Sequence, residues 1–342
     1  MPDLRDFLHE TFQKAGGAMP FDQFMAMALY DPVFGYYTSG IEDVGGARGD
    51  FATSATLSSG LAKAIAGWIH DEREHHGWEH SVPVIEVGAG NGELALEILK
   101  SFGWWKRRQI QYHIVDVSAP LRKKQEAALK SYSVEWHASV SSALEATGGE
   151  ALIISNELVD AFPAKWLRWS GIEKCWLEIF VTFNRDSGLA EIFKPMPKGF
   201  PDYDYSALAL KEPDCGQRVE IQPLFQRWLA NLSEHLEKGS ILTIDYGGRA
   251  AELYDRRPGG TLRAYHRQQR IEGGGVYQRF GKQDLTVDVN FGDLISWGED
   301  FDLESVREES QAEFLHRFGE GADEMASSGV GEAFRVLHQR RD

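Results

Sequence analysis

Cysteine is nearly absent from this chain, which has only Cys175 and Cys215 among 342 residues. Two widely separated cysteines are too few for a disulfide scaffold or a zinc site, so we expect neither, and we expect no other metal centre. No apolar run approaches the roughly 20 residues of a membrane span. The first ten residues are acidic and lack the apolar core of a signal peptide. These absences predict a cytoplasmic protein without membrane insertion.

Basic residues are outnumbered by acidic ones, with 36 Lys and Arg against 52 Asp and Glu, and the formal net charge is −16. A nucleic-acid partner is disfavoured, because binding it needs a basic footprint. The charge mildly favours a basic partner or substrate segment. The chain is 42% hydrophobic with charge spread along it, which predicts a globular protein of one elaborated domain or two modest ones.

Three glycines at alternate positions, Gly88, Gly90 and Gly92, follow a short apolar run that contains Glu86. Helical spacing begins directly afterwards, so the segment is typical of a strand, a tight turn and a helix N-terminus at a nucleotide-like ligand. A dinucleotide site would need a glycine where Glu93 stands, and a carboxylate there would repel pyrophosphate. Glu86 suits a positively charged ligand instead. S-adenosylmethionine has a sulfonium, an ammonium and no phosphate, so it is favoured over NAD.

Asp116 ends a second apolar run, 28 positions after Gly88. A carboxylate at the tip of the second strand of a nucleotide-binding α/β unit accepts hydrogen bonds from two ribose hydroxyls. A strand-end Asp is also a common helix cap, and Ser118-Ala119-Pro120 resembles a helix start. The two interpretations are compatible, and Asp116 is a candidate cofactor ligand.

Strands and helices alternate through the middle of the chain, which predicts an α/β fold with a doubly wound parallel sheet. Residues 1–80 are expected to be mainly helical, with an amphipathic stripe through Leu61, Ile65 and Trp68. Residues 164–195 are expected to form an antiparallel meander, and 246–292 a loop-rich segment. The expected strands are 82–87, 110–116, 133–137, 151–155, 241–245, 301–307 and 333–338, and the expected helices are 92–101, 119–131, 221–237 and 310–318.

Polar residues follow the strand 151–155, namely Asn156, Glu157 and Asp160. Carboxyl ends of parallel strands border the ligand crevice of an open sheet, and this strand would lie beside the first one. We therefore expect these side chains near the transferred group. The alternative is that Asn156 and Asp160 only stabilise a turn. Asp245 ends the next strand and could supply a further acid.

Together these motifs resemble the MidA family, class I S-adenosylmethionine-dependent methyltransferases whose mitochondrial members assist respiratory complex I assembly by dimethylating an arginine. The resemblance runs in order from residue 20 to 292. Its matching stretches are Met25–Pro32 with Gly35-Tyr36-Tyr37, Gly49-Asp50-Phe51, Glu86–Leu94, Ile114–Ser118 with Leu121-Arg122, Asn156–Pro163, Arg218-Val219-Glu220, Asp245-Tyr246-Gly247, Gly260-Thr261-Leu262 with Tyr265, and Asp284-Leu285-Thr286.

The resemblance implies a Rossmann-like methyltransferase domain at 81–342 after an N-terminal helical or lid region at 1–80. Insertions would be a β-meander at 164–215 and the loop-rich segment at 246–292. It implies S-adenosyl-L-methionine as cofactor, held by Glu86, Gly88, Gly90, Gly92, Asp116 and Asn156. It also implies a protein substrate, with a respiratory complex subunit as the candidate partner.

For an arginine acceptor the catalytic residues would be Asn156, Glu157 and Asp160. The guanidinium is protonated in water, with a pKa above about 12, so carboxylates must hold it and take its proton. Glu157 and Asp160 would do this, Asn156 would orient the nucleophile or the methionine portion, and Glu220 would be a third acid. The rest of the catalysis is positioning and desolvation.

The chain departs from the family pattern at three places on the substrate side. Ala55-Thr56 stands where the family has Pro-Glu, Asp288-Val289-Asn290 where it has His-Val-Asp, and Gln268 where it has His. These departures leave the expected fold and cofactor unchanged. They motivate two alternatives, an S-adenosylmethionine-binding assembly factor without turnover and a methyltransferase for another acceptor. The methyl acceptor and the oligomeric state stay open.

Overall fold

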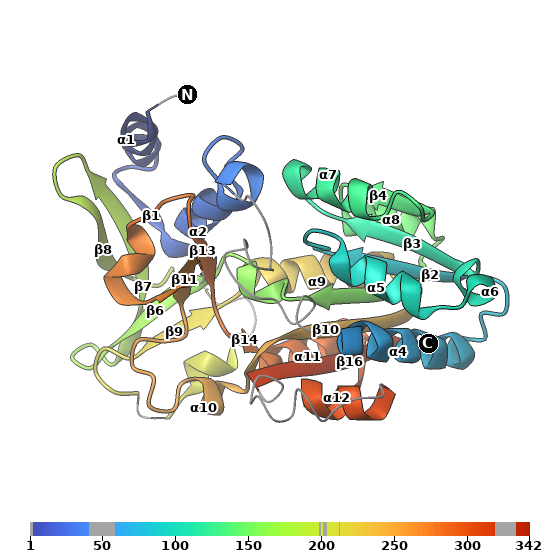
Figure 1. The fold of residues 1–342 in the computed structure, drawn as a ribbon. Helices are drawn as coiled ribbons and strands as arrows, with labels where there is room; N and C mark the ends of the chain where they lie inside the picture. The colour runs from blue at the N-terminus through green and yellow to red at the C-terminus, as the bar shows by residue number, and fades with distance from the viewer. Residues whose placement is uncertain are drawn as a thin grey trace. The chain divides into compact units, whose positions relative to one another are not determined.

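The computed structural model describes residues 3–40, 59–197, 200, 204–211, 213–267, 269–318 and 333–342 (Figure 1). Contacts within the chain divide it into two compact units, each of which is described separately. Unit 1 comprises Met1–Ile41, Ala161–Gln226 and Gly248–Asp293, and unit 2 comprises Glu42–Asp160, Arg227–Gly247 and Leu294–Asp342.

Unit 2 holds a mainly parallel sheet in the order β15-β16-β10-β5-β2-β3-β4 (Figure 1). Strands β4, β3, β2, β5 and β10 are parallel to one another, whereas β16 is antiparallel to both β10 and β15. The strands are β2 (Val82–Val87), β3 (Ile110–Val115), β4 (Val134–His137), β5 (Glu150–Asn156), β10 (Lys238–Gly248), β15 (Glu304–Ser310) and β16 (Phe334–Arg341). The predicted doubly wound α/β fold is confirmed.

The strand order reverses at β2, which pairs with β3 on one side and with β5 on the other. Every residue of β2 is buried, as expected for a parallel strand covered on both faces. A reversal of strand order opens a crevice at the carboxyl ends of the strands. Val87 and Ser155 are paired at this end, so the turns that follow them border the same crevice.

The core of unit 2 joins the sheet to the helices around it. Leu61 and Trp68 of α4, Ile98 of α5 and Phe314 of α12 belong to one buried cluster with the sheet strands, and the stripe predicted for the first of these helices is confirmed. The helices are α4 (Ser59–His76), α5 (Glu93–Ser101), α6 (Trp104–Arg107), α7 (Ala119–Ala128), α8 (Val140–Ala146) and α12 (Gln311–Phe318). Two others, α9 (Pro223–His235) and α11 (Phe291–Asp300), each contain a boundary between the units.

Unit 1 is built on a five-stranded sheet in the order β1-β7-β6-β9, with β8 on β7, and on a small sheet β12-β11-β13. The predicted meander is present as the antiparallel pairs β6–β7 and β7–β8. The elements are α1 (Leu4–Lys14), β1 (Ala18–Pro20), α2 (Phe21–Tyr30), a π-helix (Tyr36–Gly40), β6 (Lys165–Ser170), β7 (Cys175–Asn184), β8 (Gly188–Pro195), a 3-10 helix (Ser206–Ala209), β9 (Arg218–Ile221), α10 (Ala250–Leu253), β11 (Arg263–His266), β12 (Gln269–Ile271), a 3-10 helix (Gly273–Tyr277), β13 (Asp284–Thr286) and β14 (Val289–Asn290).

The two units do not follow the boundary expected at residue 80. Helix α4 belongs to unit 2, because its apolar face packs into the core of the parallel sheet. The segment 246–292, expected to be loop-rich, contains short strands that pair with one another around β11. Within the described residues, no helix has both the length and the apolar character needed to cross a membrane.

Candidate active site

The glycine turn after β2 has little room for side chains, because neighbouring residues lie close to its backbone. Gly88, Gly90 and Gly92 have φ of 72°, 55° and 85°, which side chains rarely adopt. A Cβ on Gly88 would lie 2.8 Å from Leu158 Cδ1, and one on Gly92 would lie 3.1 Å from Gln125 Cα. The turn therefore admits little besides glycine at these positions, and it leads into the N-terminus of α5. Binding of a cofactor by the three glycines stays a prediction.

Glu86 is buried in β2, where 2% of it is exposed. Its Oε2 accepts a hydrogen bond from the Tyr112 hydroxyl at 2.8 Å. Burial raises the pKa of this carboxyl to about 7, the Tyr112 hydrogen bond opposes the rise, and the charge of Asp116 adds to it. A positive charge nearby would stabilise the ionised form. The expected role of Glu86 toward a cationic ligand is compatible with this environment and remains a prediction.

Asp116 makes two hydrogen bonds just beyond the end of β3. Its Oδ1 accepts the Ser118 N–H at 2.8 Å, and its Oδ2 accepts the Gln125 side-chain amide at 2.6 Å. The Ser118 hydroxyl, rather than Asp116, caps α7 by accepting the Leu121 N–H. Burial raises the pKa of Asp116, and these two hydrogen bonds oppose the rise. Asp116 is thus fixed in orientation, and its binding of ribose hydroxyls stays a prediction.

Gln125 is a site residue that sequence reasoning missed. Its amide also donates to the Gly90 carbonyl at 2.8 Å, and its Oε1 accepts the Trp136 indole N–H at 3.1 Å. Gln125 is fully buried, and its hydrogen bonds connect the glycine turn to Asp116. The available signal was its position on α7, four residues after Leu121 and four before Leu129, where a polar residue interrupts an apolar stripe.

The tip of β5 carries Asn156 and Glu157 in a constrained arrangement. Glu157 has φ of 50°, a conformation that costs about 1–3 kcal/mol for a residue other than glycine and is concentrated at functional sites. Its N–H donates to the Ile244 carbonyl at 2.9 Å. One carboxylate oxygen accepts the Tyr246 hydroxyl at 2.7 Å, and the other accepts the Asn156 amide at 3.3 Å. The strand end thus presents an oriented carboxylate.

Asp245, at the neighbouring end of β10, supports the turn that follows β5. It is fully buried, and its Oδ2 accepts the backbone N–H groups of Val159 and Asp160 at 2.9 and 3.2 Å. Burial and the charge of Glu157 raise the pKa of Asp245, whereas the hydrogen bonds from those N–H groups lower it. The pKa of Tyr246 is also raised, by burial and then by the nearby acids, so its hydroxyl stays a donor.

The structure therefore brings together Asn156, Glu157 and Asp160 with the further acid Asp245. Asp160 is 4% exposed and lies three residues after Glu157, in the short 3-10 helix Val159–Ala161. Sequence reasoning did not identify Tyr246 as the partner of Glu157, although it follows Asp245 at the strand end. Two buried acids, Asp160 and Asp245, and the half-buried Glu157 lie at this strand end, and a positively charged ligand would stabilise their ionised forms.

Glu220 has a different environment, in unit 1. Its carboxylate accepts the Thr261 N–H at 3.0 Å, the Thr261 hydroxyl at 2.9 Å and the Leu262 N–H at 3.2 Å. A Cβ on Gly260 would lie 2.2 Å from Glu220 Oε1. The Gly-Thr-Leu segment thus packs closely around this acid and Glu220 fixes that loop, while its expected role as a third acid for the acceptor stays a prediction.

One of the three departures from the family pattern, Asp288-Val289-Asn290, lies in the described part of unit 1, where its polar residues have partners. Asp288 forms ion pairs with Arg257 and Arg263. The Asn290 amide donates to the Ser206 hydroxyl at 2.8 Å. The Gly49-Asp50-Phe51 stretch, Ala55-Thr56 and Gln268 lie outside the described residues.

The glycine turn, Asp116 after β3 and the polar groups after β5 all lie within the part of the chain that a protein-family model matches. A model described as S-adenosyl-L-methionine-dependent methyltransferase covers residues 64–308. The chain belongs to this family. It is an S-adenosyl-L-methionine-dependent methyltransferase, as the resemblance to MidA proteins implied.

Individual relatives agree with this assignment. The methyltransferase is 24% identical over 340 residues to the mitochondrial protein arginine methyltransferase NDUFAF7 homolog of Caenorhabditis elegans, covering 92% of this chain and 76% of that protein. It is 26% identical to the Danio rerio protein of the corresponding name, covering 81% and 68%. A Burkholderia thailandensis protein crystallised with S-adenosyl-homocysteine is 25% identical, with a TM-score of 0.84, covering 99% of this chain and 92% of that one.

Proposed function

We propose that this methyltransferase modifies an arginine side chain of a partner protein, with Asn156, Glu157 and Asp160 at the reacting centre. The carboxyl cluster at the tip of β5 carries the proposal, because Glu157 is oriented by two hydrogen bonds and a cation would stabilise the ionised forms of the acids around it. The names of the two relatives described above, both protein arginine methyltransferases, support the same acceptor class.

The cofactor would be held by residues on both sides of the strand reversal. We assign Gly88, Gly90 and Gly92 to close backbone approach, Asp116 to the ribose, and Glu86 with Asn156 to the methionine side. The positive φ of the glycines and the fixed orientation of Asp116 fit this use. When bound, S-adenosylmethionine supplies a methyl group activated by its sulfonium and leaves as S-adenosylhomocysteine.

The chain's own residues would prepare the acceptor. Arginine offers a planar fork of N–H groups that matches carboxylates, and Glu157 and Asp160 would hold it in line with the methyl carbon. As the new N–C bond forms, the guanidinium nitrogen must lose a proton, and one of these carboxylates would receive it. Asp245 would act indirectly, by fixing the backbone of the turn that carries Asp160.

The partner and its location are further parts of the proposal. An acidic enzyme with a net charge of −16 suits a basic segment, and a respiratory complex subunit remains the candidate. The cytoplasmic location remains a prediction, since the relatives' names describe mitochondrial proteins. We also retain, as proposed functional domains, a lid region at 1–80 and a methyltransferase domain at 81–342.

The test uses purified protein, S-adenosylmethionine with a labelled methyl group, and a lysate of cells that lack this gene. Arginine peptides should gain one or two labelled methyl groups. Glu157→Gln and Asp160→Asn should each lower labelling at least about 100-fold, the lower end of a general-base contribution, while S-adenosylhomocysteine affinity changes little. Glu145→Gln, the same change on the exposed surface of α8, is the matched control.

Two outcomes would contradict the proposal. If labelled peptides carry the methyl group on another residue type, the acceptor is wrong. If nothing is labelled and deletion of the gene still impairs assembly of a partner complex, the chain acts as a binding factor.

A further inference from the structure

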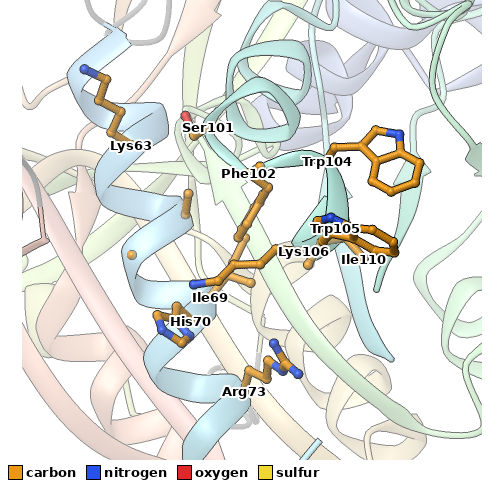
Figure 2. A pocket seen from close by; sticks show the side chains of 13 residues that line it. Lys63, Ile69, His70, Arg73, Ser101, Phe102, Trp104, Trp105, Lys106 and Ile110 are labelled. Atoms are coloured by element: carbon orange, nitrogen blue, oxygen red, sulfur yellow. The ribbon is translucent and has the colours of Figure 1, made fainter. Parts of the chain in front are cut away.

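A cleft of about 570 Å³ opens in unit 2 between α4 and the segment 101–110 (Figure 2). Its titratable lining residues are all basic or histidine: Lys63, His70, Arg73 and Lys106. Figure 2 shows the first three on α4 and the indoles of Trp104 and Trp105 on the opposite side. The cleft therefore combines cationic groups with aromatic surface.

Two adjacent tryptophans are exposed at the edge of this cleft. Trp104 is 51% exposed and Trp105 is 76% exposed. Their rings meet edge to face with centroids 4.4 Å apart, and the Arg108 guanidinium lies 4.2 Å from the centre of the Trp104 ring. Large apolar side chains this exposed and this close together mark an interaction surface rather than part of a core.

The segment that carries the tryptophans has a charge opposite in sign to that of the whole chain, although Lys100 within it is paired with Glu97. No Asp or Glu occurs between Glu97 and Asp116, a stretch that contains four Lys and Arg residues. The complete chain has a formal charge of −16. A local basic surface on an acidic protein selects an anionic partner and confines contact to this face.

The cleft lies near the amino ends of the strands, whereas the proposed cofactor crevice lies at their carboxyl ends. Ile110, which lines the cleft, is the first residue of β3, whereas Asp116 follows the last. A strand of six residues spans about 20 Å. A partner bound at the cleft would therefore leave the carboxyl ends of the strands open to acceptor and cofactor.

We propose that Trp104, Trp105 and the surrounding basic residues form a docking surface for an anionic phospholipid membrane. Tryptophan is favoured at the level of the headgroups, where its ring is partly in an apolar environment while its N–H remains hydrated. Lys63, Lys106 and Arg108 add electrostatic attraction to anionic headgroups. Docking is peripheral, through side chains at the headgroup level.

The full-length protein is sedimented with vesicles of phosphatidylcholine alone, or of phosphatidylcholine and phosphatidylglycerol in equal parts. We expect binding only to the anionic vesicles, a blue shift of tryptophan emission, and release by high salt. Trp104→Ala/Trp105→Ala should weaken binding at least about tenfold. Lys63→Glu/Lys106→Glu should weaken it more, since each basic residue near an anionic surface contributes roughly fivefold.

The matched control is Ile172→Ala/Arg256→Glu, which changes an exposed apolar side chain and an exposed cation in unit 1 and should bind like the wild type. A normal thermal shift with S-adenosylhomocysteine verifies that each variant is folded. Equal sedimentation with both vesicle types, or wild-type binding by the tryptophan variant, would overturn the proposal. So would full release by soluble glycerol phosphate, or a preference for an acidic peptide or an RNA oligonucleotide over the vesicles.

Discussion

Replacing Glu86 with Gln tests the electrostatics of the buried strand that leads to the glycine turn. The pKa of this carboxyl rises from an ordinary 4.5 to about 7 on folding, chiefly because it is buried. A folded pKa above the unfolded one means that its favourable contribution is complete below pH 4.5 and is lost as the pH rises toward 7. At about 1.4 kcal/mol per pKa unit, the loss amounts to about 3 kcal/mol.

Glu86→Gln keeps the shape and can still accept the hydrogen bond from Tyr112, but it never ionises. Measured by urea unfolding without cofactor, its stability relative to the wild type should therefore increase by about 3 kcal/mol between about pH 4 and pH 8. Glu93→Gln, an exposed change at the start of α5, should alter stability by less than about 0.5 kcal/mol. A difference between Glu86→Gln and wild type that does not vary with pH would refute the reasoning.

Three other changes have defined outcomes. Asp116→Ala should weaken S-adenosylmethionine binding, measured by calorimetry, by about 1.5–3 kcal/mol, the range for hydrogen bonds to a charged acceptor. An unchanged affinity would mean that Asp116 only stabilises the turn. Gln125→Leu should lower the free energy of unfolding by about 1–3 kcal/mol, because it leaves the half-buried Gly90 carbonyl without its donor, and should also weaken cofactor binding. Burial alone would raise the pKa of Glu72, but hydrogen bonds from His338, Arg340 and Ser240 lower it well below 4.5. Its stabilisation is therefore present above pH 4.5 and is lost as the pH falls below that value, and Arg340→Ala should reduce this acid-dependent part of the unfolding free energy.

Local patterns predicted the parallel sheet well, because its strands are short apolar runs and its helices have apolar residues at helical spacing. The strand predicted at 82–87 matches β2, and the helix predicted at 92–101 matches α5 to one residue. The division into the two compact units could not be derived this way, and the domain boundary proposed at residue 80 stays a prediction. Helix α4 joins the parallel sheet through side chains that pack on distant strands, which its own stripe does not specify.

The sequence indicated which residues form the candidate site, whose roles stay predictions, but not the contacts that hold them in place. Motif positions indicated Asn156, Glu157 and Asp160, since they follow a strand at the reversal of strand order. The hydrogen bond from Tyr246 to Glu157 joins residues 89 positions apart, and only the pairing of β5 with β10 brings them together. Glu220 is a different case. Its carboxylate suggested a role at the acceptor, but nothing in the sequence indicated that this group also holds the Thr261 loop.

The central claim is that the carboxyl cluster of this methyltransferase serves an arginine of a partner protein. It is tested most directly by quantitative mass spectrometry of proteins from cells with the gene, without it, and with only its Glu157→Gln form. The account predicts an arginine methylation that is present with the gene and missing both from the deletion and from the Glu157→Gln cells. The same arginine methylation in all three kinds of cell would contradict it.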